Sequence, residues 1–242
     1  MKLQHIILSF RVTFIASIIL AASLPRSTQA QVSSGLYTYV QTKFGLDQDL
    51  VNGIRYFNRY HRVLYHPFYQ GKQSLPGSVT VSGKQFDNLM INYDIYNQYV
   101  ILEYKELSGS IFKVILDPLQ ISAFQLNGHH FDKKELDENG PLFYEVIGAN
   151  GIFCYIHWEK QLLNTNNDLD YAQYFTSPSR NYFFDYHGIV HPFSNRRNLV
   201  SLFPVTSRNE IRRYLRKNNI RFRLSEVEQL SGLLEFISSN QL

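Results

Sequence analysis

The chain of 242 residues holds one cysteine, Cys154, so it cannot form an internal disulfide, and its stability has to come from a hydrophobic core. It lacks an apolar run of the roughly 20 residues that a membrane-spanning helix needs. Motifs for phosphate-binding loops, dinucleotide sites, nucleophile-elbow hydrolases and zinc proteases are also missing. These absences argue against the commonest hydrolase classes.

Residues 1–30 have the pattern of a secretory signal peptide. Lys2 and Arg11 precede an apolar run over 12–24, and a tail of small residues ends at Ala30, where we expect cleavage. The remaining 212 residues are enough for one domain with a core. Gln31, not cysteine, follows the cleavage site, so we expect no lipoprotein. We expect an exported protein, soluble or peripheral, in the periplasm or at the outer-membrane surface.

The charge of the expected mature chain is almost balanced. Three of the 24 basic residues and none of the 20 acidic residues fall within 1–30, which leaves 21 basic residues against 20 acidic ones. A general nucleic-acid binder has a much stronger basic bias. We therefore expect no nucleic acid among the partners.

Most of the chain alternates apolar and polar residues with a period of two, which predicts strands. The 18 Phe and 17 Tyr also favour strands. Asn127-Gly128 and Asn150-Gly151 predict tight turns, whereas 129–140 and 161–179 are polar and predict loops. The expected strands cover residues 78–82, 88–95, 99–104, 110–116, 119–126, 142–147, 152–158, 181–186, 189–193 and 198–203.

Near the C-terminus the period changes. Ser207 and Glu210 have the spacing of a capping box, which predicts a helix, and Ser225 with Glu228 repeats this signal after a short expected strand over 220–224. We expect a mainly β (α+β) fold, one domain over 31–242. Its antiparallel sheet would have about nine or ten short strands, strongly curved, as a sandwich or an open barrel, before a C-terminal helix–strand–helix over about 207–242.

An integral outer-membrane barrel is a third architecture to weigh. The expected strands of 5–8 residues are shorter than the about 9–11 that such a barrel needs. The chain also ends in a polar segment after the two expected helices. We therefore favour a protein released from the membrane.

A set of short segments, in one order along the chain, resembles a group of uncharacterised exported β-rich proteins of Gram-negative bacteria. The resemblance covers most of the mature chain and implies an envelope location and a shared fold, but no activity, ligand or site residue. The segments are Asn52–Phe57, His66–Phe68, Pro76–Val79, Tyr93–Asn97, Tyr144–Gly151 and Ile211–Asn218.

Four histidines are candidate metal ligands. His61 and His66 lie in a segment that begins Tyr-His and ends His-Pro-Phe, and His187 and His191 lie in a second segment of the same kind. The four imidazoles would converge if the segments paired. Shared local motifs more often reflect shared turn chemistry, so we expect no metal and no cofactor.

Other residues point to catalysis less strongly. Cys154 lies on the expected inner face of its strand, where a small buried hydrophobe belongs and where a thiol is inert. A glycoside hydrolase would need a pair of carboxylates. Asp94 shares its strand face with Asn92, a residue expected to face solvent. The candidates for such a pair are Asp94, Glu103, Glu106, Glu145 and Asp185.

A run of basic residues marks the first expected C-terminal helix. Arg208, Arg212 and Arg216 stack at i, i+4 spacing, with Arg213 and Lys217 beside them. Such a face suits an anionic membrane surface or an acidic envelope protein. The alternative is a solvated face whose late charges suit the helix dipole.

These patterns favour an exported, non-enzymatic accessory or binding protein of the cell envelope. A hydrolase that uses an acidic pair on envelope or extracellular polymers is the alternative.

Overall fold

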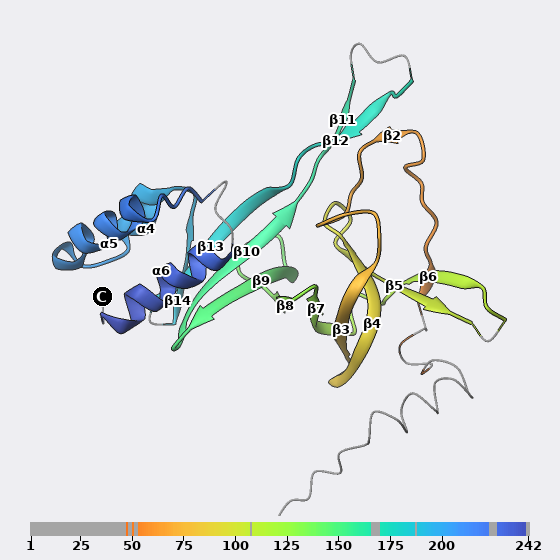
Figure 1. Ribbon diagram of the computed structural model, residues 1–242, viewed down its shortest axis with the longest axis horizontal. Helices are drawn as coiled ribbons and strands as arrows, with labels where there is room; N and C mark the ends of the chain where they lie inside the picture. The colour runs from red at the N-terminus through yellow and green to blue at the C-terminus, as the bar shows by residue number, and fades with distance from the viewer. Residues whose placement is uncertain are drawn as a thin grey trace, which may run out of the picture. The chain divides into compact units, whose positions relative to one another are not determined.

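Eleven strands form one antiparallel sheet, with β1 and β14 at its two ends (Figure 1). The strands, in spatial order, are β1 (Ile54–Arg55), β6 (Ile111–Ile115), β5 (Tyr99–Lys105), β4 (Lys84–Asp94), β3 (Leu75–Val81), β7 (Ile121–Leu126), β8 (His129–Lys134), β9 (Leu142–Ala149), β10 (Ile152–Glu159), β13 (Ser179–Tyr186) and β14 (Ile189–Phe193). Among the described strands β1 and β14 do not pair with each other, so the sheet is open.

This computed structural model describes residues 47, 50, 53–106, 108–165, 170–186, 188–222 and 227–240. All of them belong to one unit, Gly45–Leu242. The expected signal peptide, His187 and Ser225 lie outside the described residues. No helix in the described ranges is both long enough and apolar enough to cross a membrane.

A second, smaller sheet joins distant parts of the chain. It contains β11 (Leu162–Asn164), β12 (Gln173–Phe175) and β2 (Val63–Leu64), and β12 runs parallel to β2. Figure 1 shows β11 and β12 as an extension of β10 and β13, beside β2. The expected loop over 161–179 therefore contains two short strands, which bring the segment ahead of β3 next to the chain that follows β10.

The two Asn-Gly pairs form the tight turns that the sequence predicts. Asn127 and Asn150 have φ angles of 50° and 48°, and the glycines that follow have 85° and 84°, as a type I′ turn requires. The first turn sends the chain back as β8, so the expected loop over 129–140 is wrong for its first half. Only Phe131 of β8 is fully buried, which is why the segment is so polar.

The period of two divides the apolar side chains of the central strands between two faces. One face, with Ile147, Cys154 and Ile156, belongs to the main core. Helix α6 (Val227–Ser239) packs on β9 and β10 and adds four buried apolar side chains to this core. The other face carries a small cluster of three buried aromatic side chains, Tyr144 of β9, Tyr155 of β10 and Phe183 of β13.

The last expected strand, 198–203, is wrong. Residues Arg196–Ser201 form helix α4, and the Asn195 side chain caps it by accepting the N–H of Asn198 at 2.9 Å. Leu199, Val200 and Phe203 are buried. Their spacing suits one face of a helix, whereas apolar density alone had indicated a strand.

The second helix begins before its expected cap. Helix α5 spans Val205–Lys217 with Pro204 at the N-cap, and no side chain caps it, so the capping box at Ser207 is wrong. The expected strand after it is also wrong over its described residues, 220–222. Ile220 and Phe222 alternate because both are buried in a connection. The mainly β fold class is confirmed, with three short helices at its C-terminal end.

Strand β3 lies close to its neighbours at Gly77. An added Cβ would lie 2.2 Å from the Gln125 carbonyl oxygen and 2.8 Å from Cδ1 of Ile91. We expect Gly77→Ala to lower the free energy of unfolding by about 1–3 kcal/mol, because the backbone has to move. Urea unfolding followed by the fluorescence of the single tryptophan, Trp158, measures this.

The control is Gly71→Ala, where an added Cβ meets no atom within 4 Å. It should change the free energy of unfolding by less than about 0.5 kcal/mol. Equal effects of the two substitutions would contradict the packing described for β3.

Candidate functional site

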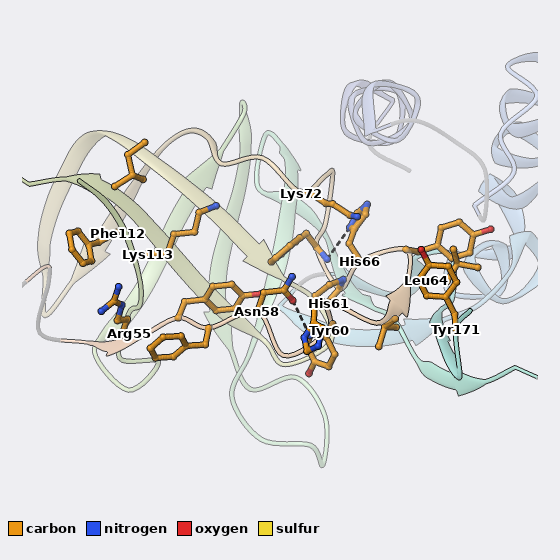
Figure 2. A pocket seen from close by; sticks show the side chains of 17 residues that line it. Arg55, Asn58, Tyr60, His61, Leu64, His66, Lys72, Phe112, Lys113 and Tyr171 are labelled. Carbon is orange, nitrogen blue, oxygen red and sulfur yellow. Dashed lines mark hydrogen bonds between the residues drawn. The ribbon is translucent and has the colours of Figure 1, made fainter. Parts of the chain in front are cut away.

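A pocket of about 670 Å³ lies between the segment ahead of β3 and strand β6. Figure 2 shows its side chains in a row, with Arg55 and Phe112 at one end, Leu64 and Tyr171 at the other, and His61 and His66 between them. None of the described residues that line it is Asp or Glu. They are residues 55–58, 60, 61, 63–68, 72, 111–113 and 171.

The pocket carries three permanent cations. The Arg55 guanidinium lies 4.9 Å from the ring centre of Phe112 and 5.4 Å from that of Phe57, and these rings hold it by cation–π attraction. Lys113 is paired with Glu103 at 2.9 Å. Arg55 and Lys72 have no carboxylate partner among the described ion pairs, so their charges are available to a ligand.

His66 is held as a neutral ring. Its Nδ1 accepts the N–H of Phe68 at 3.2 Å, so this nitrogen carries no proton, and the two rings stack at 5.9 Å. Burial lowers the pKa of His66, and the positive charges of Lys160 and Lys72 lower it further. His66 therefore offers Nε2–H as a donor at neutral pH.

Two further features of the pocket wall are unusual. The Tyr56 hydroxyl is buried and has no hydrogen-bond partner among the described residues. Burial, followed by the charge of Asp94 and by Tyr60, raises the pKa of Tyr56 to about 12. Tyr65 has a φ of 68°, a left-handed conformation that is strained for a bulky residue. Orphaned polar atoms and strained residues both gather at functional sites.

Hydrogen bonds to the main sheet hold the pocket wall in place. The Lys160 ammonium donates to the carbonyl oxygens of His66 at 2.7 Å and Phe68 at 3.1 Å. The N–H of Ile95 donates to the Pro67 carbonyl at 3.0 Å, and the N–H of Tyr69 donates to the Tyr93 carbonyl at 2.9 Å. The chain that follows β10 therefore fixes the segment that lines the pocket.

The carboxylates proposed for hydrolysis serve other contacts. Asp94 and Asn92 are 0% and 3% exposed, so the expectation that they face solvent is wrong. The Asn92 amide donates to the carbonyls of Gly71 and Gln73, which cover it. Asp94 accepts two backbone N–H groups of the turn before β5; burial raises its pKa, and these hydrogen bonds partly oppose the shift.

Glu145 is buried in the main core, 1% exposed. It accepts hydrogen bonds from Trp158 Nε1 at 2.7 Å and the Tyr69 hydroxyl at 3.3 Å, and its other oxygen lies 2.5 Å from His129 Nδ1. These contacts compensate a buried carboxylate. The same charge, after burial itself, raises the pKa of the Cys154 thiol, so the interpretation of Cys154 as a buried, inert residue agrees with the structure.

The remaining carboxylates have contacts of their own. Glu103 is bound to Lys113 and to the Ser74 hydroxyl. Asp185 accepts the N–H of Gly188 in the turn between β13 and β14. Glu106 accepts a long hydrogen bond, 3.4 Å, from Ser108.

The histidine candidates do not all meet. His61 and His66 both line the pocket. His191 lies on β14 opposite Phe184, which lies opposite Cys154 on β10. His191 therefore lies level with Cys154, whereas His66 lies beside Lys160. Lys160 follows Cys154 by six residues, which is about 20 Å along an extended chain. The described part of the chain holds no group of three His, Cys, Asp or Glu residues that could bind a metal ion.

The basic residues of α5 separate into two groups. Arg208, Arg212 and Arg216 line a cleft against α4, whereas Arg213 and Lys217 do not. No sequence pattern indicated Arg55, Lys72, Lys113 or Lys160 in advance. The basic and aromatic residues clustered between 55 and 72 could have indicated Arg55 and Lys72.

Lys160 gives the fold a specific pH dependence. Burial lowers the pKa of Lys160 from 10.5 to about 8, although the charge of Asp94 acts in the opposite direction. Between pH 8 and 10.5 the unfolded chain keeps the proton that the folded chain has lost, so the contribution of Lys160 to stability rises with pH in this window.

Urea unfolding of the wild type and of Lys160→Met, followed by tryptophan fluorescence, tests this. We expect Lys160→Met to be less stable at every pH, because two partly buried carbonyls lose their donor. The difference in unfolding free energy should grow from pH 8 to pH 10. A constant or shrinking difference would contradict the described environment of Lys160.

No family model matches this chain, and no curated protein or solved structure matches it. The resemblance to exported β-rich proteins of Gram-negative bacteria therefore stays a prediction.

Proposed function

We propose that the protein is an exported, non-enzymatic binding protein of the cell envelope that holds an acidic oligosaccharide in the pocket of Figure 2. One observation carries the proposal: the described lining combines aromatic rings with the cations Arg55 and Lys72 and contains no carboxylate. The signal-like pattern of residues 1–30 supports export.

The aromatic residues suit the sugar rings. The C–H face of a pyranose is apolar and packs against an aromatic ring, whose face is electron-rich. Phe57 and Tyr65 are 66% and 61% exposed, so they present such faces to solvent. The extended row of side chains suits several linked units rather than one.

The cations suit the acidic groups. A guanidinium offers a planar fork of donors that matches a carboxylate, and an ammonium offers a point charge. Arg55 is already oriented by the rings beneath it, so less side-chain entropy is lost when it binds. The His66 Nε2–H adds a neutral hydrogen-bond donor for sugar hydroxyls.

A binding role is favoured over hydrolysis by the same lining. Glycoside hydrolysis needs two carboxyl groups roughly 5–10 Å apart at the bond to be cleaved. The five carboxylates considered from the sequence are in a turn, in the core or in surface contacts, and none of them lines the pocket.

Calorimetry with oligogalacturonate and with its methyl ester tests the proposal, because the two ligands share their rings and differ in charge. We expect the acid to bind and the ester to bind at least roughly tenfold more weakly. Combined Arg55→Gln and Lys72→Gln should weaken binding of the acid by a similar factor.

The matched control is Arg59→Gln with Arg62→Gln. This pair removes the same charge from the same segment, but neither residue lines the pocket, so affinity should change less than about twofold. Equal binding of the ester, equal losses in both double variants, or release of new reducing ends from the ligand would each overturn the proposal.

A further inference from the structure

A second cleft, of about 610 Å³, lies between α4 and α5, which are neighbours in Figure 1. Of the seven described residues that line it, five are arginines, two from α4 and three from α5. The lining is Arg196, Arg197, Val200, Ser201, Arg208, Arg212 and Arg216. The three from α5 are the stacked residues of the sequence analysis, and α4 adds the other two.

Neutral acceptors hold three of these side chains in place. Arg208 donates to the carbonyl oxygens of Phe203 at 2.8 Å and Ser201 at 3.0 Å, at the C-terminal end of α4. Arg196 donates to the Ile220 carbonyl at 2.9 Å. Arg212 donates to the Asn209 side chain at 2.9 Å. A guanidinium has five N–H donors, so these hydrogen bonds leave three donors in Arg208 and four each in Arg196 and Arg212.

The charge of the cleft is not neutralised within the described part of the chain. None of the ion pairs described there includes any of the five arginines. Like charges at i, i+4 spacing repel one another on a helix. A concave wall of one charge sign also concentrates its field in the cleft. A bound anion would relieve this repulsion.

We propose that this arginine cleft binds a group that carries clustered phosphates. The guanidinium fork matches the oxygens of a phosphate in two parallel hydrogen bonds, and several forks around one cleft suit more than one phosphate. The volume lies within the range of small-ligand sites. The proposal does not depend on the oligosaccharide pocket, which shares no residue with the cleft.

The phosphates have two possible sources, a soluble polyphosphate or the headgroups of a lipid surface. Val205, at the start of α5, is 75% exposed. An exposed apolar side chain beside basic residues is typical of proteins that lie on a membrane surface. The two sources require separate arms in the experiment.

The first arm titrates the purified protein with sodium tripolyphosphate by calorimetry. The second measures co-sedimentation with vesicles of phosphatidylcholine, alone or mixed with phosphatidylglycerol. Each arm compares the wild type with Arg212→Gln plus Arg216→Gln in the cleft, and with Arg213→Gln plus Lys217→Gln as the control. Both pairs remove two positive charges from exposed positions of α5, and only the first pair lines the cleft.

We expect the cleft pair to weaken binding at least roughly tenfold and the control pair less than about twofold. Circular dichroism should show the same helix content in both variants. Binding of tripolyphosphate without vesicles assigns a soluble source, and vesicle binding that requires phosphatidylglycerol assigns a lipid source. Failure of both probes to bind, or equal losses in the two variants, would overturn the proposal.

Discussion

The Lys160 ammonium, buried against the carbonyl oxygens of His66 and Phe68, is the contact on which the candidate site depends. It links the end of β10 to a segment that otherwise has little regular structure. Without this donor two partly buried carbonyls would lose a hydrogen bond, and a cost of up to about 1–3 kcal/mol applies to a group that stays shielded from water. The turn carboxylate Asp94 partly compensates the buried charge. The pairing of β2 with β12 is a second link between the segment ahead of β3 and the chain that follows β10.

Charge is nearly balanced over the expected mature chain but not in its two concave sites. The five carboxylates considered from the sequence lie in turns, in the core or, for Glu103, in an ion pair with Lys113. None of them lines the pocket that holds Arg55 and Lys72 or the cleft that holds five arginines. A concave basic surface attracts anions more strongly than the net charge suggests. The overall composition argues against a general nucleic-acid binder and is compatible with selective anion sites.

Local signals predicted the elements well where one physical cause dominates. The Asn-Gly turns and the alternating strands β4, β5, β9 and β10 follow from φ preferences and from one buried face. Residues 198–203 mislead because their apolar density indicates a strand, whereas the spacing of the buried residues suits a helix, which begins at the cap formed by Asn195. Asp94 and Asn92 are buried because a distant segment covers their strand, which no local pattern reveals. The pocket joins residues near 55–72, 111–113 and Tyr171, so only tertiary structure could show it.

We propose above all that the pocket of Figure 2, whose described lining contains no carboxylate, binds acidic sugars. A crystal structure of the protein with oligogalacturonate tests it most directly. The account predicts sugar rings against the aromatic residues of the pocket, with carboxylates at hydrogen-bond distance, about 2.7–2.9 Å, from Arg55 and Lys72. A ligand bound elsewhere, or one bound here with its carboxylates turned towards solvent, would contradict it.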